Sequence, residues 1–290
     1  MTSSESKQEV VVFLHVPRTA GTTLSRFLRS KFPPDQVFHA SYAAGETLSE
    51  QLPALRALSP QVRERLRLII AGHAEYGQHE ALGSKTKYLT VIRDPIDRVI
   101  SSYRFLHDHP DDPLYPEVVG RKMSVSAFVS SDSAKGINDW QVRCLAGVPW
   151  SASEWTADVL GQAKRNIERH FLAVGLTERF PETIVLLGRI FGWRDLHYAT
   201  LNISSSRTQC SAKDRELILE RNQLDQKLYE FASARFDQQL ASFSNIDVDL
   251  RRLRRENQVY VPIYHAYRAA RRMKETLAPR LRRQITSRLR

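Results

Sequence analysis

The stretch VVVFLHVPRTAGTTL, at residues 10–24, decides the fold of this chain. Its first part, Val10–Leu14, is an uninterrupted apolar run rich in β-branched residues, which is typical of a strand buried on both faces of a parallel sheet. A short loop follows, and helical spacing begins at Thr22, with Thr22 or Thr23 as the expected N-cap. The stretch therefore predicts a strand, a loop and a helix in that order.

Three further apolar runs have the same character. They are Leu66–Ala71, Tyr88–Ile92 and Phe171–Val174. Helical patterns lie between the strands, at about residues 47–65, 124–131, 138–146, 153–169, 179–191 and 213–242, while His107–Pro116 has the composition of an irregular loop. Strands that alternate with helices indicate an α/β fold with a parallel sheet flanked by helices.

The charge of the chain is concentrated at one end. The 290 residues include 43 Lys and Arg and 32 Asp and Glu, a net charge of +11. Residues 251–290 hold 13 of the basic and 2 of the acidic residues, which leaves 30 of each sign in residues 1–250. A neutral body excludes a uniformly basic nucleic-acid-binding protein, so we expect no specific nucleic-acid partner. We divide the chain into a polar segment, a domain and a basic tail, at 1–9, 10–250 and 251–290.

The cysteines and the N-terminal segment bear on the compartment. Cys144 and Cys210 form neither a disulfide framework nor a metal-type spacing, which favours a reducing compartment. The polar start, Met1–Glu9, is unlike a signal peptide, and no apolar run is long enough to span a membrane. His107–Asp112 has metal-ligand residue types without a recognised spacing. We therefore expect a cytoplasmic protein without a metal.

The loop after the first strand has the chemistry of an anion site. A glycine lets the backbone approach an anion, N–H groups point outward at the helix start, and hydroxyls and a guanidinium surround them. The loop lacks the second glycine and the Gly-Lys-Ser/Thr ending of a Walker A sequence. The alternative is an ordinary capped helix start. The candidate binding residues are Pro17, Arg18, Thr19, Ala20, Gly21, Thr22 and Thr23.

Three motifs carry a resemblance to a known family. Residues 15–24 closely resemble the 5′-phosphosulfate loop of the carbohydrate O-sulfotransferases, in particular the branch that contains heparan sulfate 2-O-sulfotransferase and its bacterial relatives. Residues 88–103, YLTVIRDPIDRVISSY, resemble the 3′-phosphate motif of that family, and residues 174–180, VGLTERF, resemble a third block. The resemblance implies a P-loop-like sheet and 3′-phosphoadenosine 5′-phosphosulfate (PAPS) as the co-substrate.

The resemblance also implies roles for single residues. Arg93 and Ser101 match the arginine and serine that hold the 3′-phosphate, and a guanidinium can grip a phosphate with two hydrogen bonds. The alternative for Arg93 is a structural ion pair with Asp94 or Asp97. The family usually has lysine where this chain has Arg18, which keeps the charge and can stabilise the departing phosphate. The family often places a basic loop near Arg207, so Arg207 is a further candidate for nucleotide binding.

A general base is expected in GHAEYG, residues 72–77, which resembles the histidine-containing block of this branch. His73 is the candidate, because its ordinary pKa of about 6.5 suits proton abstraction near neutrality. The alternative is a histidine that caps the strand end, and Glu75 or His79 could assist or replace it. Trp140 lies in a stretch that resembles a family helix near the acceptor, where it could stack on a sugar or fill the core.

The basic tail at 251–290 has its own pattern. Leucine or isoleucine recurs every four residues, at Leu277, Leu281, Ile285 and Leu289. We expect a helix interrupted at Pro262 and Pro279. Such a helix can bind an anionic membrane surface, which would make the protein peripheral at the membrane, or a polyanion, or it can pack on the body. Two functions remain: a sulfotransferase with a carbohydrate acceptor, and a noncatalytic polyanion- or membrane-binding protein on a nucleotide-binding scaffold.

Overall fold

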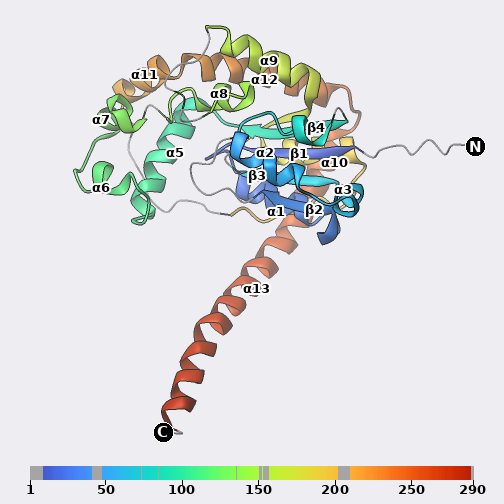
Figure 1. The fold of residues 1–290 in the computed structure, drawn as a ribbon, viewed down its shortest axis with the longest axis vertical. Helices are drawn as coiled ribbons and strands as arrows, with labels where there is room; N and C mark the ends of the chain where they lie inside the picture. The colour runs from blue at the N-terminus through green and yellow to red at the C-terminus, as the bar shows by residue number, and fades with distance from the viewer. Residues whose placement is uncertain are drawn as a thin grey trace, which may run out of the picture.

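A parallel five-stranded sheet forms the centre of the molecule (Figure 1). The computed structural model describes residues 9–40, 48–72, 74–83, 85–134, 136–149, 152, 157–201 and 210–288. The strand order is β2-β3-β1-β4-β5. The strands are β1 (Val10–His15), β2 (Val37–Ala40), β3 (Leu68–Gly72), β4 (Thr86–Ile92) and β5 (Phe171–Leu176). The predicted α/β fold class is confirmed, and β2 is a strand that the sequence analysis missed.

Helices connect the strands and cover the sheet. The first half of the chain contains α1 (Gly21–Arg29), α2 (Leu48–Arg56), α3 (Pro60–Arg65), α4 (His79–Leu82), α5 (Pro95–Asp108), α6 (Tyr115–Val118), α7 (Val125–Ser130) and α8 (Trp140–Ala146). The second half contains α9 (Val159–His170), α10 (Phe180–Phe191), α11 (Ala212–Arg221), α12 (Gln223–Ala241) and α13 (Ile246–Arg288). Two short 3₁₀ turns lie at Pro34–Gln36 and Asp132–Ala134.

The central strand β1 is buried on both faces, as its apolar run predicts. Val12, Phe13 and Leu14 are inaccessible to solvent. Helices α8, α9 and α12 pack on one another above the sheet in Figure 1, and α10 packs against α13 on the opposite side. This burial fixes the carboxyl ends of β1 and β4, where the candidate site lies.

A second apolar cluster lies beside the sheet. Residues of α5, α6, α7 and α11 form it, with Phe128 fully buried and Tyr103 nearly so. Figure 1 shows these helices as a separate group at one end of the sheet. Helix α5 belongs to both regions, because it begins at the end of β4 and continues into this cluster.

Several expected boundaries differ from the structure. The helices expected at 47–65 and 213–242 are each divided in two, and α5 extends to Asp108, into the segment expected to be a loop. The predicted basic C-terminal helix is present, but it begins at Ile246 and continues through Pro262 and Pro279. Within the described chain, no helix is both long and apolar enough to cross a membrane.

Candidate active site

The loop between β1 and α1 has an unusual backbone. Arg18 and Ala20 have positive φ angles of 68° and 62°, whereas Thr19 between them does not. Such alternation turns successive N–H groups toward one side and forms a concave anion-binding nest. Left-handed residues other than glycine are strained, and strain of this kind concentrates at ligand-binding sites. The loop geometry therefore favours anion binding.

The start of α1 differs from the expected cap. Ala20 is the N-cap, in place of Thr22 or Thr23, and alanine has no oxygen that could cap the helix. Gly21 is required by the close approach of His15, since an added Cβ would lie 1.7 Å from the imidazole Cδ2. The helix start thus presents backbone N–H groups, which carry the positive end of the helix dipole.

The loop threonines have different environments. Thr19 is buried, and its hydroxyl donates a hydrogen bond of 2.8 Å to the Val16 carbonyl. Thr23 is also buried, and its hydroxyl accepts a bond of 3.0 Å from the Leu201 N–H. Thr22 is exposed. The buried hydroxyls therefore fix the loop and anchor the chain at Leu201, and Thr22 presents its side chain at the surface.

The two predicted arginines and the serine lie together. Arg18 Nε donates to Ser101 Oγ at 3.2 Å, and Arg93 Nη1 donates to the Arg18 carbonyl at 3.3 Å. Ser101 lies on α5, eight residues after Arg93, so one helix and one strand end deliver both groups to the loop. Because β1 and β4 are parallel neighbours, their carboxyl ends bring the loop, Arg93 and Ser101 to one edge of the sheet.

Positive charge is concentrated at this point. Burial lowers the pKa of the Arg18 guanidinium, the charge of Arg93 lowers it further, and Asp108 opposes both effects. The Arg18 guanidinium carbon also lies 4.6 Å from the centre of the Phe105 ring, a cation–π contact. Two guanidiniums that repel each other in a partly buried site favour the binding of an anion between them.

Glu178 is the carboxylate partner of Arg93. Its Oε1 lies 3.8 Å from Arg93 Nε and accepts a hydrogen bond of 3.1 Å from the Asp94 N–H. Tyr229 donates to the other oxygen of Glu178 at 3.0 Å. The alternative pairing of Arg93 with Asp94 or Asp97 is wrong, because the Asp94 side chain instead accepts the Asp97 N–H and caps α5.

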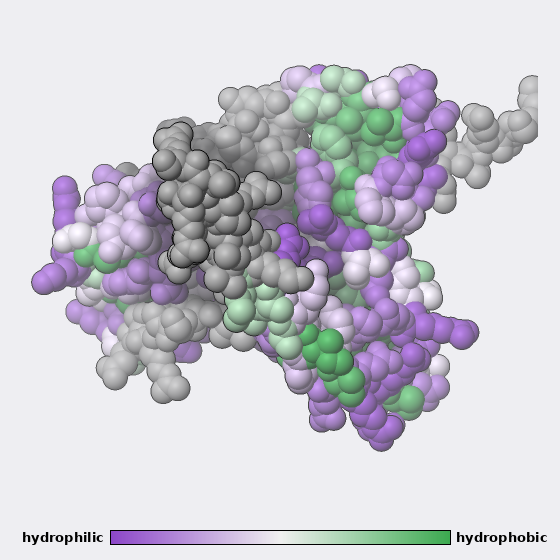
Figure 2. Space-filling model, turned by 90° about the horizontal axis from the view of Figure 1, so that it is seen from below, coloured by the Kyte–Doolittle hydropathy of each residue, from purple (hydrophilic) through white to green (hydrophobic). Residues whose placement is uncertain are grey.

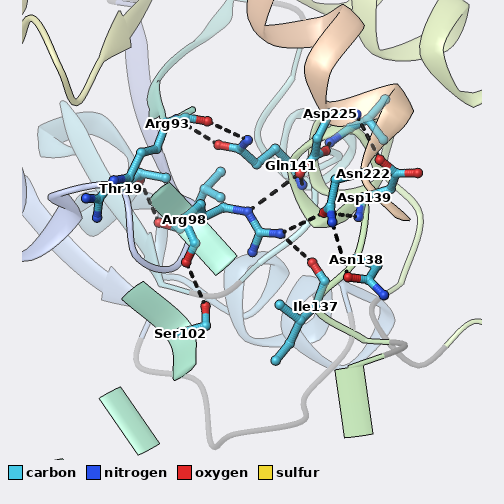
Figure 3. Close-up of polar contacts among 12 residues, drawn as sticks. Thr19, Arg93, Arg98, Ser102, Ile137, Asn138, Asp139, Gln141, Asn222 and Asp225 are labelled. Carbon is cyan, nitrogen blue, oxygen red and sulfur yellow. Dashed lines mark hydrogen bonds and ion pairs between the residues drawn. The ribbon is translucent and has the colours of Figure 1, made fainter. Parts of the chain in front are cut away.

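A network of buried polar side chains holds the backbone of Arg93 in place (Figure 3). Gln141 is fully buried, and its amide accepts the Arg93 N–H and donates to the Arg93 carbonyl, each at 2.8 Å. Asp225 on α12 accepts the backbone N–H groups of Val142 at 2.8 Å and of Gln141 at 3.3 Å. Sequence reasoning missed both residues, which lie 48 and 132 positions from Arg93 along the chain.

An ion pair and a second carboxylate complete this network. Arg98 Nε lies 3.6 Å from Asp225 Oδ2, and both side chains are fully buried. Asp139 Oδ1 accepts the N–H groups of Leu224 at 3.1 Å and of Asp225 at 2.9 Å. Burial and the neighbouring charge of Asp225 raise the pKa of Asp139 to about 6. The network connects α5, α8 and α12 beside Arg93 (Figure 3).

The candidate bases are only partly within the described residues. Of the candidate bases, His73 lies outside them, as does Arg207, the candidate for nucleotide binding. Glu75 is buried and interacts electrostatically with Arg143. His79 Nδ1 lies 3.0 Å from the Tyr88 hydroxyl, and its ring centre is 5.0 Å from that of His170, the residue before β5. This contact places His79 toward the amino end of β5, away from the loop that follows β1.

Trp140 and one cluster of possible metal ligands, which the sequence analysis did not single out, lie elsewhere in the structure. Trp140 packs against both apolar clusters, which favours the core alternative over an exposed sugar-stacking position. Within the described ranges, Asp195, His197 and Glu256 form a cluster whose potential ligand atoms lie within 4.8 Å of one another. Lys31 pairs with Asp195 at 3.5 Å, and Arg252 pairs with Glu256 at 2.6 Å, so side-chain cations already neutralise these carboxylates.

The structure is thus an α/β fold with a loop at the carboxyl edge of its sheet whose geometry suits an anion. A family model described as galactose-3-O-sulfotransferase matches residues 149–274. Heparin sulfate O-sulfotransferase of Drosophila melanogaster is 28% identical over 256 residues, which cover 79% of this chain and 72% of that protein. Heparan sulfate 2-O-sulfotransferase 1 of Homo sapiens is 28% identical over 204 residues, 64% of this chain and 56% of the human protein.

These matches show that this chain is similar to carbohydrate sulfotransferases, in agreement with the resemblance seen in its motifs. The chain spans little more than half the length of the mammalian relatives that it matches. Among solved structures, a sulfotransferase from Alicyclobacillus acidocaldarius aligns with a TM-score of 0.38 at 15% identity, covering 81% of this chain and 95% of that one. Mouse sulfotransferase SULT7A1 complexed with PAP aligns with a TM-score of 0.37 at 12% identity, covering 76% and 66%.

Proposed function

We propose that this protein is a sulfotransferase that moves a sulfuryl group from PAPS to a hydroxyl of a carbohydrate or glycoconjugate. The observation that carries the proposal is the convergence of Arg18, Arg93 and Ser101 on the left-handed loop at the start of α1. The donor has two anionic ends, a 5′-phosphosulfate and a 3′-phosphate. Under this proposal the loop N–H groups and Arg18 would hold the first, and Arg93 and Ser101 the second.

The residues fit the donor in the following way. The backbone of residues 17–23 would hold the 5′-phosphosulfate, with Thr22 as the exposed hydroxyl. Arg93 and Ser101 would hold the 3′-phosphate, with Glu178 fixing the guanidinium. Glu178 leaves other N–H groups of Arg93 to donate to a phosphate, because a guanidinium has five. Electrostatics and positioning would therefore supply most of the catalysis, as in phosphoryl transfer.

In the reaction, an S–O bond forms to the acceptor oxygen while the S–O bond to the 5′-phosphate breaks. Arg18 would stabilise the negative charge that develops on the departing phosphate, and as a permanent cation it needs no proton transfer. His73 would take the proton of the acceptor hydroxyl. Its position in the chain supports this role, because Gly72 directly before it pairs with His15 at the start of the donor loop. His79 is the weaker candidate, since it lies toward the opposite edge of the sheet.

The acceptor is proposed as a carbohydrate because each relative is named for activity on one. An acceptor screen with radiolabelled donor would identify it. The alternative, a noncatalytic anion-binding protein on the same scaffold, predicts nucleotide binding with no transfer to any hydroxyl.

The first test is ligand-induced thermal stabilisation. We expect 3′-phosphoadenosine 5′-phosphate (PAP), the product nucleotide, to raise the Tm and ATP with Mg²⁺ to have little effect. Arg93→Ala should remove most of the PAP effect. Arg165→Ala is the matched control, because Arg165 pairs with Asp158 on the surface of α9, outside the site. Stabilisation by ATP alone, or a PAP effect that Arg93→Ala leaves intact, would contradict the proposal.

A further inference from the structure

Helix α13 is anchored to the body only over its first part. Asn257 accepts the Tyr198 N–H at 2.9 Å through its side-chain oxygen. Tyr264 is 4% exposed, and the Arg26 guanidinium lies 4.4 Å from its ring centre. Beyond this point the helix projects away from the sheet and its flanking helices (Figure 1). The 24 residues from His265 to Arg288 would extend about 36 Å as a straight helix.

One face of α13 is apolar and exposed. The side chains of Val259, Ile263, Tyr267 and Met273 are 67%, 63%, 60% and 61% exposed. At about 100° per residue, these four positions lie within an arc of about 120°. The sequence continues the spacing at Leu277, Leu281 and Ile285. Four large apolar side chains on one arc of a helix form an exposed apolar surface.

Arginines lie on the other side of the helix from this arc. Arg268 and Arg271 lie at about 100° or more from the centre of the apolar arc. After Arg271 the sequence adds six more arginines and Lys274, against Glu275 as the acidic residue. Between Val259 and Met273 the helix therefore has an apolar face and arginines on another face, the pattern of helices that lie in a membrane interface.

We propose that α13 from Val259 onward docks on an anionic lipid surface. Its apolar arc would enter the boundary between headgroups and acyl chains, and its arginines would contact the anionic headgroups. This inference goes beyond the proposed transferase activity and does not depend on it. Docking would hold the transferase domain beside the membrane, because the anchored start of α13 fixes the helix to that domain.

The apolar arc distinguishes a lipid surface from other occupants. A soluble polyanion would attract the arginines but gives Ile263 and Met273 no apolar partner. A second copy of the helix would cover the apolar arc but brings a second cationic face close to the first. Figure 2 views the molecule from the side on which α13 projects, and there hydrophobic residues on the coloured surface form separate patches among hydrophilic ones.

Sedimentation of the full chain with lipid vesicles tests the proposal. We expect binding to vesicles of phosphatidylcholine with phosphatidylserine, and much weaker binding to phosphatidylcholine alone. Ile263→Glu should weaken binding to the anionic vesicles by about tenfold or more, since it removes one buried apolar side chain and adds a negative charge. Val62→Glu is the matched control, because Val62 is a 42% exposed apolar side chain on the body, and it should bind as the parent does.

Other results would overturn the proposal. They are equal binding of the Ile263→Glu and Val62→Glu proteins, equal binding to neutral and anionic vesicles, or no sedimentation of the parent chain. A heparin fragment that binds the parent and the Ile263→Glu protein equally, without vesicle binding, would assign α13 to a polyanion. Light scattering that shows a dimer lost in Ile263→Glu, again without vesicle binding, would assign the arc to a second copy. An unchanged Tm of Ile263→Glu shows that the variant folds.

Discussion

Replacement of Gln141 by leucine should weaken the fold and the donor site together. Gln141 is fully buried, and its amide bonds both the N–H and the carbonyl of Arg93 at 2.8 Å. Leucine has a similar size but leaves both backbone groups without their partner, and each buried unsatisfied group costs about 1–3 kcal/mol. We therefore expect the free energy of unfolding to fall by about 2–5 kcal/mol.

The Gln141→Leu substitution should also weaken binding of the donor nucleotide. Arg93 directly follows β4 and precedes the N-cap of α5. Its backbone position therefore sets where its guanidinium would meet the donor. A displacement of about 1 Å at such a site can cost up to about a hundredfold in rate or affinity. We expect the Kd for PAP to rise at least about tenfold, and the KM for the donor to rise more than the KM for the acceptor.

Urea unfolding and calorimetric titration with PAP measure the two effects. Gln239→Leu is the matched control: Gln239, on α12, also donates to a strand carbonyl, that of Leu172 near the start of β5, at 2.8 Å. The control should lose stability and keep its affinity for PAP. If Gln141→Leu loses stability but binds PAP as the parent does, Gln141 does not position Arg93. If its stability is unchanged, the two backbone groups are not dependent on Gln141.

Four further changes test the network and the catalytic roles. Asp225→Asn should cost about 3–5 kcal/mol in urea unfolding, because it leaves the Arg98 charge buried without its partner, and adding Arg98→Met should recover part of that loss. Because folding raises the pKa of Asp139, its carboxyl contributes to stability below about pH 4, and this contribution is lost as the pH rises through about 6. The Asp139→Asn protein should therefore unfold at a higher urea concentration than the parent at pH 8. At pH 4 the two proteins should unfold at the same urea concentration. Arg18→Ala should lower turnover at saturating donor at least about tenfold, and near-normal turnover would remove its role at the departing phosphate. His73→Ala should abolish transfer and leave the calorimetric affinity for PAP intact, and surviving transfer would move the base to another residue.

The sequence was sufficient to predict those features of the fold and the site that depend on a local pattern. The run Val10–Leu14 has apolar side chains on both faces, which predicts a strand buried on both sides, and β1 is buried in this way in the structure. The spacing from Arg93 to Ser101 is about two helical turns, which brings both residues to the same side of α5. Because parallel strands end at one edge, the loop and these two residues converge as expected. Local pattern and sheet geometry together were enough to locate the site.

The sequence could not predict the contacts that hold the site in place. Glu178 was part of a recognised block, yet pairing with Arg93 depends on β5 lying beside β4, which no local pattern reveals. Gln141 and Asp225 are ordinary polar residues on helices, and their burial follows from how α8 packs on α12. The left-handed backbone at Ala20 was also unexpected, since the neighbouring threonines are better capping residues. Long-range packing, and not residue type, decides each of these.

The net charge of +11 therefore acts in two ways. In the neutral body, anion binding depends on a few cations in fixed positions: Arg93 is held by Glu178 and Gln141, and Arg18 by Ser101 and Phe105. Such a site loses affinity when one support is removed, even though the net charge is unchanged. In α13 the arginines follow one another along an extended helix, so binding to an anionic surface would depend on their number and be screened by salt. A substitution of Gln141 should thus affect the donor and not the membrane, and Ile263→Glu should do the reverse.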